Sequence, residues 1–223
     1  MILYHITSLE KPIQSILIPK IPDETEIGEN YTEKRICLAP SILECLKSAE
    51  IVNKFDDEVG LVRVYNVKIN EDDPNLVGWN KLYEEGLVPD AALTHEYWYK
   101  KPIMPIECSV YRVSGWTKKE YIIVDAVQKE QIKKILFEMK LYDGQIEKWS
   151  AFDIVNYWLP LHGEIWVERF KQRLVHSVID YTPESAKMYE SLFGEKPKLS
   201  HEEQDFHINK YLETCTIVKE SSM

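Results

Sequence analysis

The chain has 223 residues, of which 44% are hydrophobic, so it can bury the core of one large domain or of two small ones. The formal net charge of −10 argues against a nucleic-acid partner, because phosphate binding relies on Lys and Arg. Without a Cys-x-x-Cys pair, a signal peptide or an apolar run near the roughly 20 residues of a membrane helix, we expect a cytoplasmic protein with reduced thiols and no membrane partner.

The pattern of the first half predicts short strands and one clear helix. Residues 60–69 alternate between two faces, which is typical of a strand. Pro40 fits the first turn of a helix over 40–49, because its missing N–H costs nothing there. Residues 78–92 are ambiguous and are interpreted as one short helix. The strands are expected over residues 2–6, 35–39, 60–69, 94–99 and 103–113.

The second half changes from strands to helices. One more strand is expected at 120–126, and apolar positions at helical spacing follow it. The sequence therefore predicts an α+β protein of two domains, with a small mixed or antiparallel β-core over 1–115 and a mainly helical C-terminal unit over 116–223. The helices are expected over residues 128–141, 151–159, 164–180, 183–193 and 202–218.

Three blocks of the first half are similar to an enzyme family. In order, they are Leu3-Tyr4-His5-Ile6-Thr7, Arg35-Ile36-Cys37-Leu38-Ala39 and Glu96-Tyr97. They resemble the Leu-x-His-Gly-Thr, Gly-Ile-Tyr-Phe-Ala and Glu-Tyr strands of H-Y-E ADP-ribosyltransferases, the class of the diphtheria-toxin-like and poly(ADP-ribose)-polymerase-like enzymes. The resemblance implies an ADP-ribosyltransferase-like core in residues 1–115, with NAD as the substrate.

The family's chemistry implies roles for individual residues. Cleavage of the nicotinamide–ribose bond builds positive charge on the ribose, and Glu96 is the expected catalytic carboxylate that stabilises it. His5 is expected to bind the other ribose, with Thr7 in the same block. Ser41 and Arg35 are candidates for the amide and pyrophosphate contacts of NAD.

The sequence departs from the family at two points. Cys37 lies where the family has the tyrosine that stacks on nicotinamide, so Cys37 is expected to line that pocket, with Tyr31 or another tyrosine supplying the aromatic ring. Ile6 replaces the family's glycine. The departures leave two readings open, an active enzyme and a catalytically inactive nucleotide- or protein-binding module of the same fold.

The resemblance implies a glycosyltransferase that moves ADP-ribose from NAD to a macromolecule. A protein acceptor is expected, with the helical half as a docking surface and a phage or toxin-type effector as the setting. The related RNA 2′-phosphotransferases fit less well, because the chain is acidic. No metal is expected, since His201-Glu202-Glu203-Gln204-Asp205 has Asp where a zinc-protease helix needs its second His.

Overall fold

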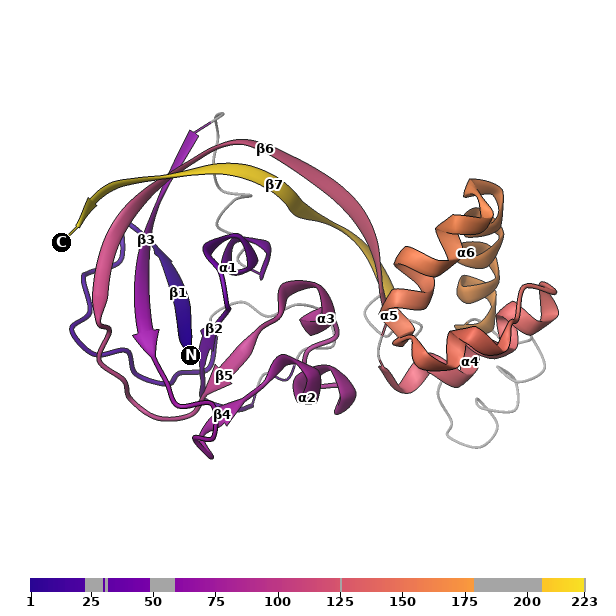
Figure 1. Cartoon of the computed structure of the whole chain (residues 1–223), viewed down its shortest axis with the longest axis horizontal. Coiled ribbons are helices and arrows are strands. Elements are labelled where there is room, and N and C mark those ends of the chain that lie inside the picture. Colours follow the sequence, from indigo (N-terminus) through magenta and orange to yellow (C-terminus); the bar gives the residue numbers. More distant parts are fainter. Residues whose placement is uncertain (23–29, 31, 49–58, 125, 179–205, 223) are drawn as a thin grey trace, which may run out of the picture. The chain divides into compact units, whose positions relative to one another are not determined.

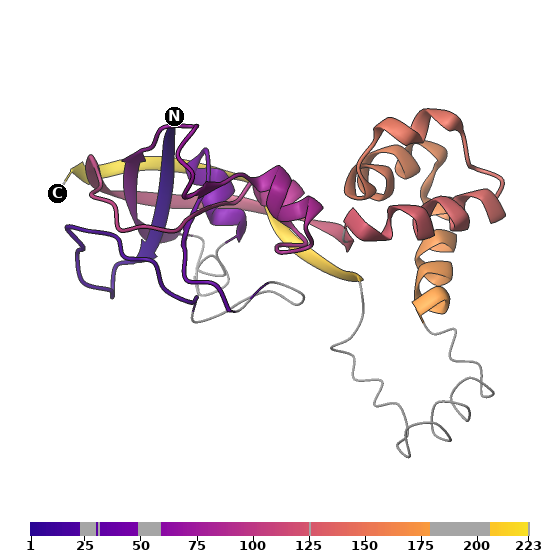
Figure 2. The same cartoon turned by 90° about the horizontal axis from the view of Figure 1, so that it is seen from below.

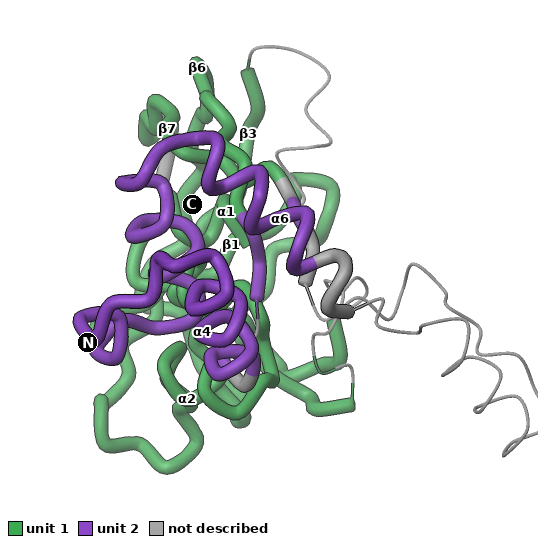
Figure 3. Tube along the Cα trace, turned by 90° about the vertical axis from the view of Figure 1, so that its right-hand side faces the viewer, with its two compact units in different colours: residues 1–121, 209–223 green, residues 122–208 purple. Residues whose placement is uncertain are grey.

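The computed structural model describes residues 1–22, 30, 32–48, 59–124, 126–178 and 206–222 (Figure 1). The chain forms two compact units, which Figure 3 colours separately. Unit 1 comprises residues 1–121 and 209–223, and unit 2 comprises residues 122–208. The end of the chain therefore returns to the first unit.

Unit 1 is built on a four-stranded sheet in the order β1-β3-β6-β7. The β1–β3 and β3–β6 pairs are antiparallel. Strands β6 and β7 are long and run side by side in both Figure 1 and Figure 2. The bounds of these strands are β1 Ile2–Ser8, β3 Val59–Lys68, β6 Glu107–Val124 and β7 Phe206–Ser222.

A second, smaller sheet has the order β2-β5-β4, with both pairs antiparallel. A backbone pair joins the smaller sheet to the larger one. Tyr4 of β1 and Ala39, which follows β2, exchange two backbone hydrogen bonds of 2.8 and 3.0 Å. Strand β2 therefore lies beside β1. The short strands are β2 Ile36–Leu38, β4 Leu76–Val77 and β5 Tyr97–Tyr99.

Two apolar clusters show which residues of β1 share a face. Alternation along the strand separates Leu3 and His5 from Tyr4 and Ile6. Tyr4 and Ile6 pack in a cluster with helix α1 (Ile42–Ser48), and Leu3 packs in another cluster on the opposite face. The first cluster includes Leu46, Val62, Val64, Val113 and Leu212, and the second includes Leu17, Leu38, Tyr65, Val67 and Tyr99.

Helix α1 begins at a capping box. The Ser41 hydroxyl accepts a 3.2 Å hydrogen bond from the backbone N–H of Glu44 and donates one of 2.7 Å to the Glu44 carboxylate. Two further short helices lie before β5, α2 (Trp79–Glu84) and α3 (Ala91–Thr94). His95 ends α3 in the left-handed conformation, with φ of 48°.

The described residues of unit 2 are mainly helical, with the end of β6 and the start of β7 at its two boundaries. Its core contains Ile132 and Leu136 of α4, Ile154 of η4 and Phe170 and Leu174 of α6, all fully buried. No helix in the described part of the chain has both the length and the apolar character needed to cross a membrane. The elements are η2 Ala126–Gln128, α4 Lys129–Glu138, η3 Gly144–Lys148, α5 Ala151–Asp153, η4 Ile154–Trp158, η5 Leu159–His162 and α6 Glu164–Val178.

The α+β class is confirmed, and several predicted elements change. The helix expected over 202–218 is wrong, because the end of the chain forms β7; its β-branched residues Thr214, Thr216, Ile217 and Val218 favour a strand. The strand expected at 120–126 is the end of β6, and 78–92 holds α2 and the start of α3 instead of one helix. The helix expected over 183–193 lies outside the described residues.

Candidate functional site

The three blocks that carry the family resemblance lie on neighbouring strands. The block around His5 is on β1, the block around Cys37 is β2, and Glu96 immediately precedes β5. The Tyr4–Ala39 pair joins β1 to β2, and Cys37 pairs with Trp98 of β5. Segments separated by up to 90 residues of sequence are thus adjacent in unit 1.

His5 links β1 to β2 through its side chain. Its Nδ1 lies 2.9 Å from the Cys37 carbonyl oxygen, and because a carbonyl only accepts, Nδ1 carries the proton. The other nitrogen, Nε2, is then an acceptor in the neutral ring. Burial lowers the pKa of His5 below its ordinary value, and Lys20 and Lys11 lower it further, against the opposing effect of the Cys37 hydrogen bond. Nε2 of His5 is therefore suited to accept a hydrogen bond from a hydroxyl group.

Thr7 lies two residues further along the same face of β1, and Arg63 of β3 is directly opposite it. Both side chains are buried, with 8% and 6% of their surface exposed. Among the residues that the structure describes, the hydroxyl oxygen of Thr7 has no hydrogen-bond partner. Thr7 is a candidate from the sequence, whereas Arg63 is not, because in the sequence it is one more polar residue of an alternating strand.

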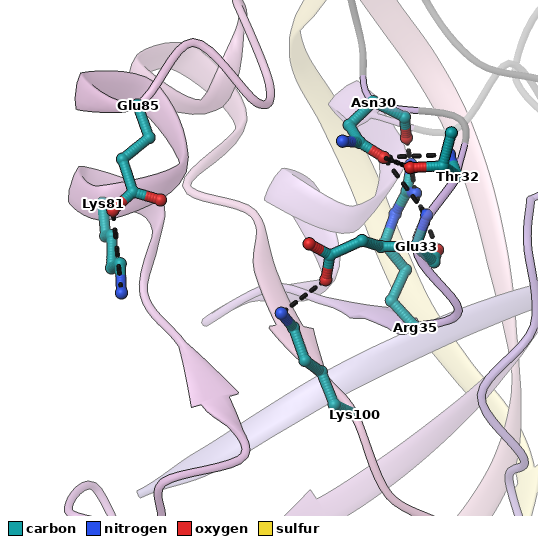
Figure 4. A network of polar contacts seen from close by, with 7 residues as sticks. All are labelled: Asn30, Thr32, Glu33, Arg35, Lys81, Glu85 and Lys100. Carbon is teal, nitrogen blue, oxygen red and sulfur yellow. Dashed lines mark hydrogen bonds and ion pairs between the residues drawn. The ribbon is translucent and has the colours of Figure 1, made fainter.

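Arg35 is fully buried and held by its surroundings (Figure 4). Its guanidinium donates hydrogen bonds of 2.7 and 3.2 Å to the carbonyls of Asn30 and Glu33, and it lies over the Trp98 ring. The Asn30 side chain accepts from the backbone N–H groups of Thr32 and Glu33, and the Glu33 carboxylate pairs with Lys100. These contacts give Arg35 a structural role in the loop before β2.

Glu96 is also buried, with 6% of its surface exposed. Its Oε1 accepts a 2.7 Å hydrogen bond from the indole Nε1 of Trp98. Burial raises the pKa of the nearby Cys45 thiol, and the negative charges of Glu96 and Glu44 add to the rise. Glu96 therefore lies on the α1 side of the sheet, where Cys45 donates to the Tyr4 carbonyl.

The structure does not bring the two principal candidates, His5 and Glu96, into contact. The His5 ring lies 6.1 Å from the ring of Tyr65, on the face of Leu3. Tyr97 and Tyr99 pack in the same cluster as Leu3, so Glu96, which alternates with them, lies on the other side, near Cys45 of α1. His5 and Glu96 thus belong to two different sheets, which the Tyr4–Ala39 pair joins, and they lie on opposite sides. Beyond Tyr4 and Ala39 no further backbone pair joins the described parts of β1 and β2, and the His5–Cys37 hydrogen bond lies where the two strands part.

The remaining candidates have other placements. Cys37 is half-buried at the centre of β2, and its carbonyl is the group that holds His5. Ser41 caps α1, which sets its hydroxyl against Glu44. Tyr31 lies outside the described residues.

A second polar pair beside Glu96 was not selected from the sequence. Nδ1 of His95 lies 2.5 Å from Oε1 of Glu44, and the His95 ring makes an edge contact with Trp79 at 4.7 Å between centroids. The Ser-x-x-Glu spacing of Ser41 and Glu44 was a readable signal for the cap, but nothing local in the sequence links Glu44 to His95. The pair orients an imidazole next to the candidate carboxylate.

No cluster of three or more His, Cys, Asp or Glu side chains suited to a metal ion is found among the described residues. The candidate groups are the buried carboxylate of Glu96 on one side and, on the other, the oriented imidazole of His5 with the buried side chains of Thr7 and Arg63. Comparison with known proteins gives no match to this chain, whether with family models, with curated proteins or with solved structures.

Proposed function

We propose that unit 1 is an ADP-ribosyltransferase-like domain that binds NAD and transfers its ADP-ribose to a protein. The observation that carries the proposal is the adjacency of β1, β2 and β5, with His5 bonded to the Cys37 carbonyl where β1 and β2 part. The three blocks similar to the H-Y-E enzymes thus lie on or beside three neighbouring strands.

His5 has the protonation state that the proposed role requires. With its Nδ1 proton donated to Cys37, the neutral ring presents Nε2 as an acceptor for a ribose hydroxyl. The lowered pKa keeps the ring neutral at pH 7. A neutral, oriented imidazole fixes a sugar without adding a charge beside it.

Glu96 supplies the charge that the reaction needs. A buried carboxylate interacts more strongly with the developing oxocarbenium charge than an exposed one, because less water screens it. Trp98 fixes the orientation of the carboxylate through Oε1. Glycosidic bond cleavage releases nicotinamide, and the acceptor's nucleophile forms the new bond to the ribose while losing its proton.

The proposal is tested with labelled NAD, a cell lysate and the Glu96→Gln variant. The amide of Gln can still accept from Trp98, so the fold is expected to survive while label transfer falls by roughly 10²-fold or more. Glu85→Gln is the matched control, because Glu85 is exposed and forms an ion pair with Lys81 at 3.7 Å (Figure 4). Equal transfer by wild type and Glu96→Gln would contradict the assignment.

The second candidate is a catalytically inactive nucleotide- or protein-binding module of the same fold. It is favoured by the separation of His5 and Glu96, which lie on opposite sides and in different sheets, and by Cys37 in place of the family's tyrosine. Stoichiometric NAD binding without release of nicotinamide, in a protein whose fold is intact, would support this reading over the enzyme.

A protein acceptor would need a docking surface, for which unit 2 has four aromatic residues to consider, Trp149, Tyr157, Trp158 and Trp166. Trp158 is buried in the core of unit 2, and Trp149 and Trp166 pack against that core. Tyr157 is 42% exposed and is the one of the four that presents substantial surface. We therefore retain Tyr157 alone as an anchor candidate.

A further inference from the structure

Arg63 places a positive charge in the interior of β3. It is 6% exposed, and its guanidinium donates to the backbone carbonyls of Lys11 and Leu9, the latter at 3.4 Å. No carboxylate within the described ranges forms an ion pair with it. A buried charge without a counter-charge is costly, so the arrangement calls for an anion.

The residue opposite Arg63 has an unused polar group as well. Thr7 and Arg63 are direct partners in the β1–β3 register, so their side chains share one face. The Thr7 hydroxyl and the Arg63 Nε are both buried without a hydrogen-bond partner. Two neighbouring donors that lack acceptors can serve the oxygens of a single ligand group.

The surroundings add positive potential although the whole chain is acidic. Lys11 and Lys20 both act electrostatically on His5, which lies two residues before Thr7 on the same face. Three cationic side chains are thus near one point in a protein whose formal net charge is −10. Such a local concentration favours an anionic ligand.

We propose that Thr7 and Arg63 form a binding site for a phosphate group. His5 lies beside it and accepts a hydroxyl of the same ligand through Nε2. The Arg63 Nε and Thr7 hydroxyl donors suit the oxygens of phosphate, whereas the neutral imidazole suits a sugar hydroxyl. In this proposal Thr7 and Arg63 make the pyrophosphate contact that the sequence suggested for Arg35. Arg35 instead contacts Asn30, Glu33 and Trp98.

The phosphate site is independent of catalysis. It rests on the proposed function only for the identity of the ligand, in which the phosphate is one half of the NAD diphosphate. A single buried water between Thr7 and Arg63 is the competing occupant, since water also satisfies such a pair. An experiment with inorganic pyrophosphate separates the two occupants.

The test measures pyrophosphate binding by calorimetry and follows the His5 ring by NMR. Thr7→Val is the main variant, because it preserves shape and removes a hydroxyl that has no partner, so the fold is expected to survive. It should bind pyrophosphate roughly tenfold more weakly than wild type. Thr117→Val is the control, since Thr117 is exposed and bonds Thr214 instead.

Arg63→Lys is the second variant, which keeps the charge but removes the Nε donor, and it should also weaken binding. If Arg63→Lys fails to fold, Thr7→Val decides. Absence of pyrophosphate binding to wild type, or equal binding by wild type and Thr7→Val, would overturn the site. Pyrophosphate binding without NAD consumption would support the phosphate site and contradict the proposed enzyme activity. NAD consumption that neither variant changes would support the enzyme activity and contradict the phosphate site.

Discussion

The guanidinium of Arg35 lies over the indole of Trp98, with 4.1 Å between the guanidinium carbon and the ring centroid. The same indole donates from Nε1 to the candidate carboxylate of Glu96. Trp98 therefore has a cation on its face and an anion at its edge, an arrangement that suits the charge distribution of an aromatic ring. Because all three side chains are buried, we expect Arg35 and Trp98 together to hold the Glu96 carboxylate in place.

Replacement of Arg35 by Lys tests the structural role of this stacking. Lys keeps the charge but loses the planar stacking and the paired bonds to Asn30 and Glu33, so we expect the free energy of unfolding to fall by about 2 kcal/mol. Urea unfolding measures it. The control is Arg112→Lys, whose side chain is half-exposed and pairs with Glu220. An equal loss in both variants would contradict a special role for the Trp98 contact.

Much of unit 1 could be predicted because its strands carry local signals. The sequence predicts a strand over residues 60–69 whose side chains alternate between two faces, which matches β3, and Pro40 precedes a helix with helical apolar spacing. The C-terminal strand could not be predicted in the same way, because its partner, β6, is remote in sequence. Pairing between distant segments decides such a strand.

The candidate site was predictable only in part for a related reason. A resemblance places His5, Cys37 and Glu96 in order along the chain, but the register decides which face each side chain takes. A shift of one residue between β2 and β5 exchanges the faces of Glu96 and Tyr97. Contacts such as Thr7 with Arg63 and Glu44 with His95 join segments with no local signal, so only the fold shows them.

Replacement of Ser41 distinguishes a role in capping α1 from a role in NAD binding. We expect Ser41→Ala to lower the free energy of unfolding by about 1 kcal/mol, because α1 loses its N-cap. NAD affinity should be unchanged if the hydroxyl is engaged with Glu44. The matched variant Ser41→Asp restores a capping acceptor and should recover stability. If Ser41→Ala loses NAD binding while its free energy of unfolding is unchanged, Ser41 contacts NAD and the assigned capping role is wrong.

Cys45 is expected to be chemically inert in the folded protein. Burial raises its thiol pKa, the carboxylates of Glu96 and Glu44 raise it further, and the thiol is 5% exposed. Since the thiolate is the reactive species, alkylation at pH 8 should not label Cys45 until the protein unfolds. Peptide mapping after a timed reaction measures this, with half-buried Cys37 as the internal comparison. Rapid labelling of Cys45 would show that the α1 side opens readily.

His5 should make stability depend on pH. Because its folded pKa lies below the ordinary value of about 6.5, the unfolded chain takes up the proton first as pH falls. The contribution is thus fully present above about pH 6.5 and is lost as pH falls toward the folded pKa, with a slope of at most about 1.4 kcal/mol per pH unit.

A comparison of wild type with His5→Gln between pH 5 and 8 isolates this effect from the other five histidines of the chain. The stability advantage of wild type over the variant should shrink on acidification. An advantage that grows at low pH would mean that the folded protein binds the proton more tightly than the unfolded chain, against the assigned effect of burial.

The return of the chain end to unit 1 is tested at Leu212 of β7. Leu212 is 3% exposed and packs in the cluster of Val62, Val64 and Val113, which also holds α1 against β1. We expect Leu212→Ala to lower the free energy of unfolding by about 3 kcal/mol, because it removes buried methyl groups and leaves a cavity. Val218→Ala on the same strand is the control, since Val218 is 49% exposed and its change should cost under about 1 kcal/mol. Equal, small losses would mean that β7 contributes little to the core, and the boundary of unit 1 would then end with β6.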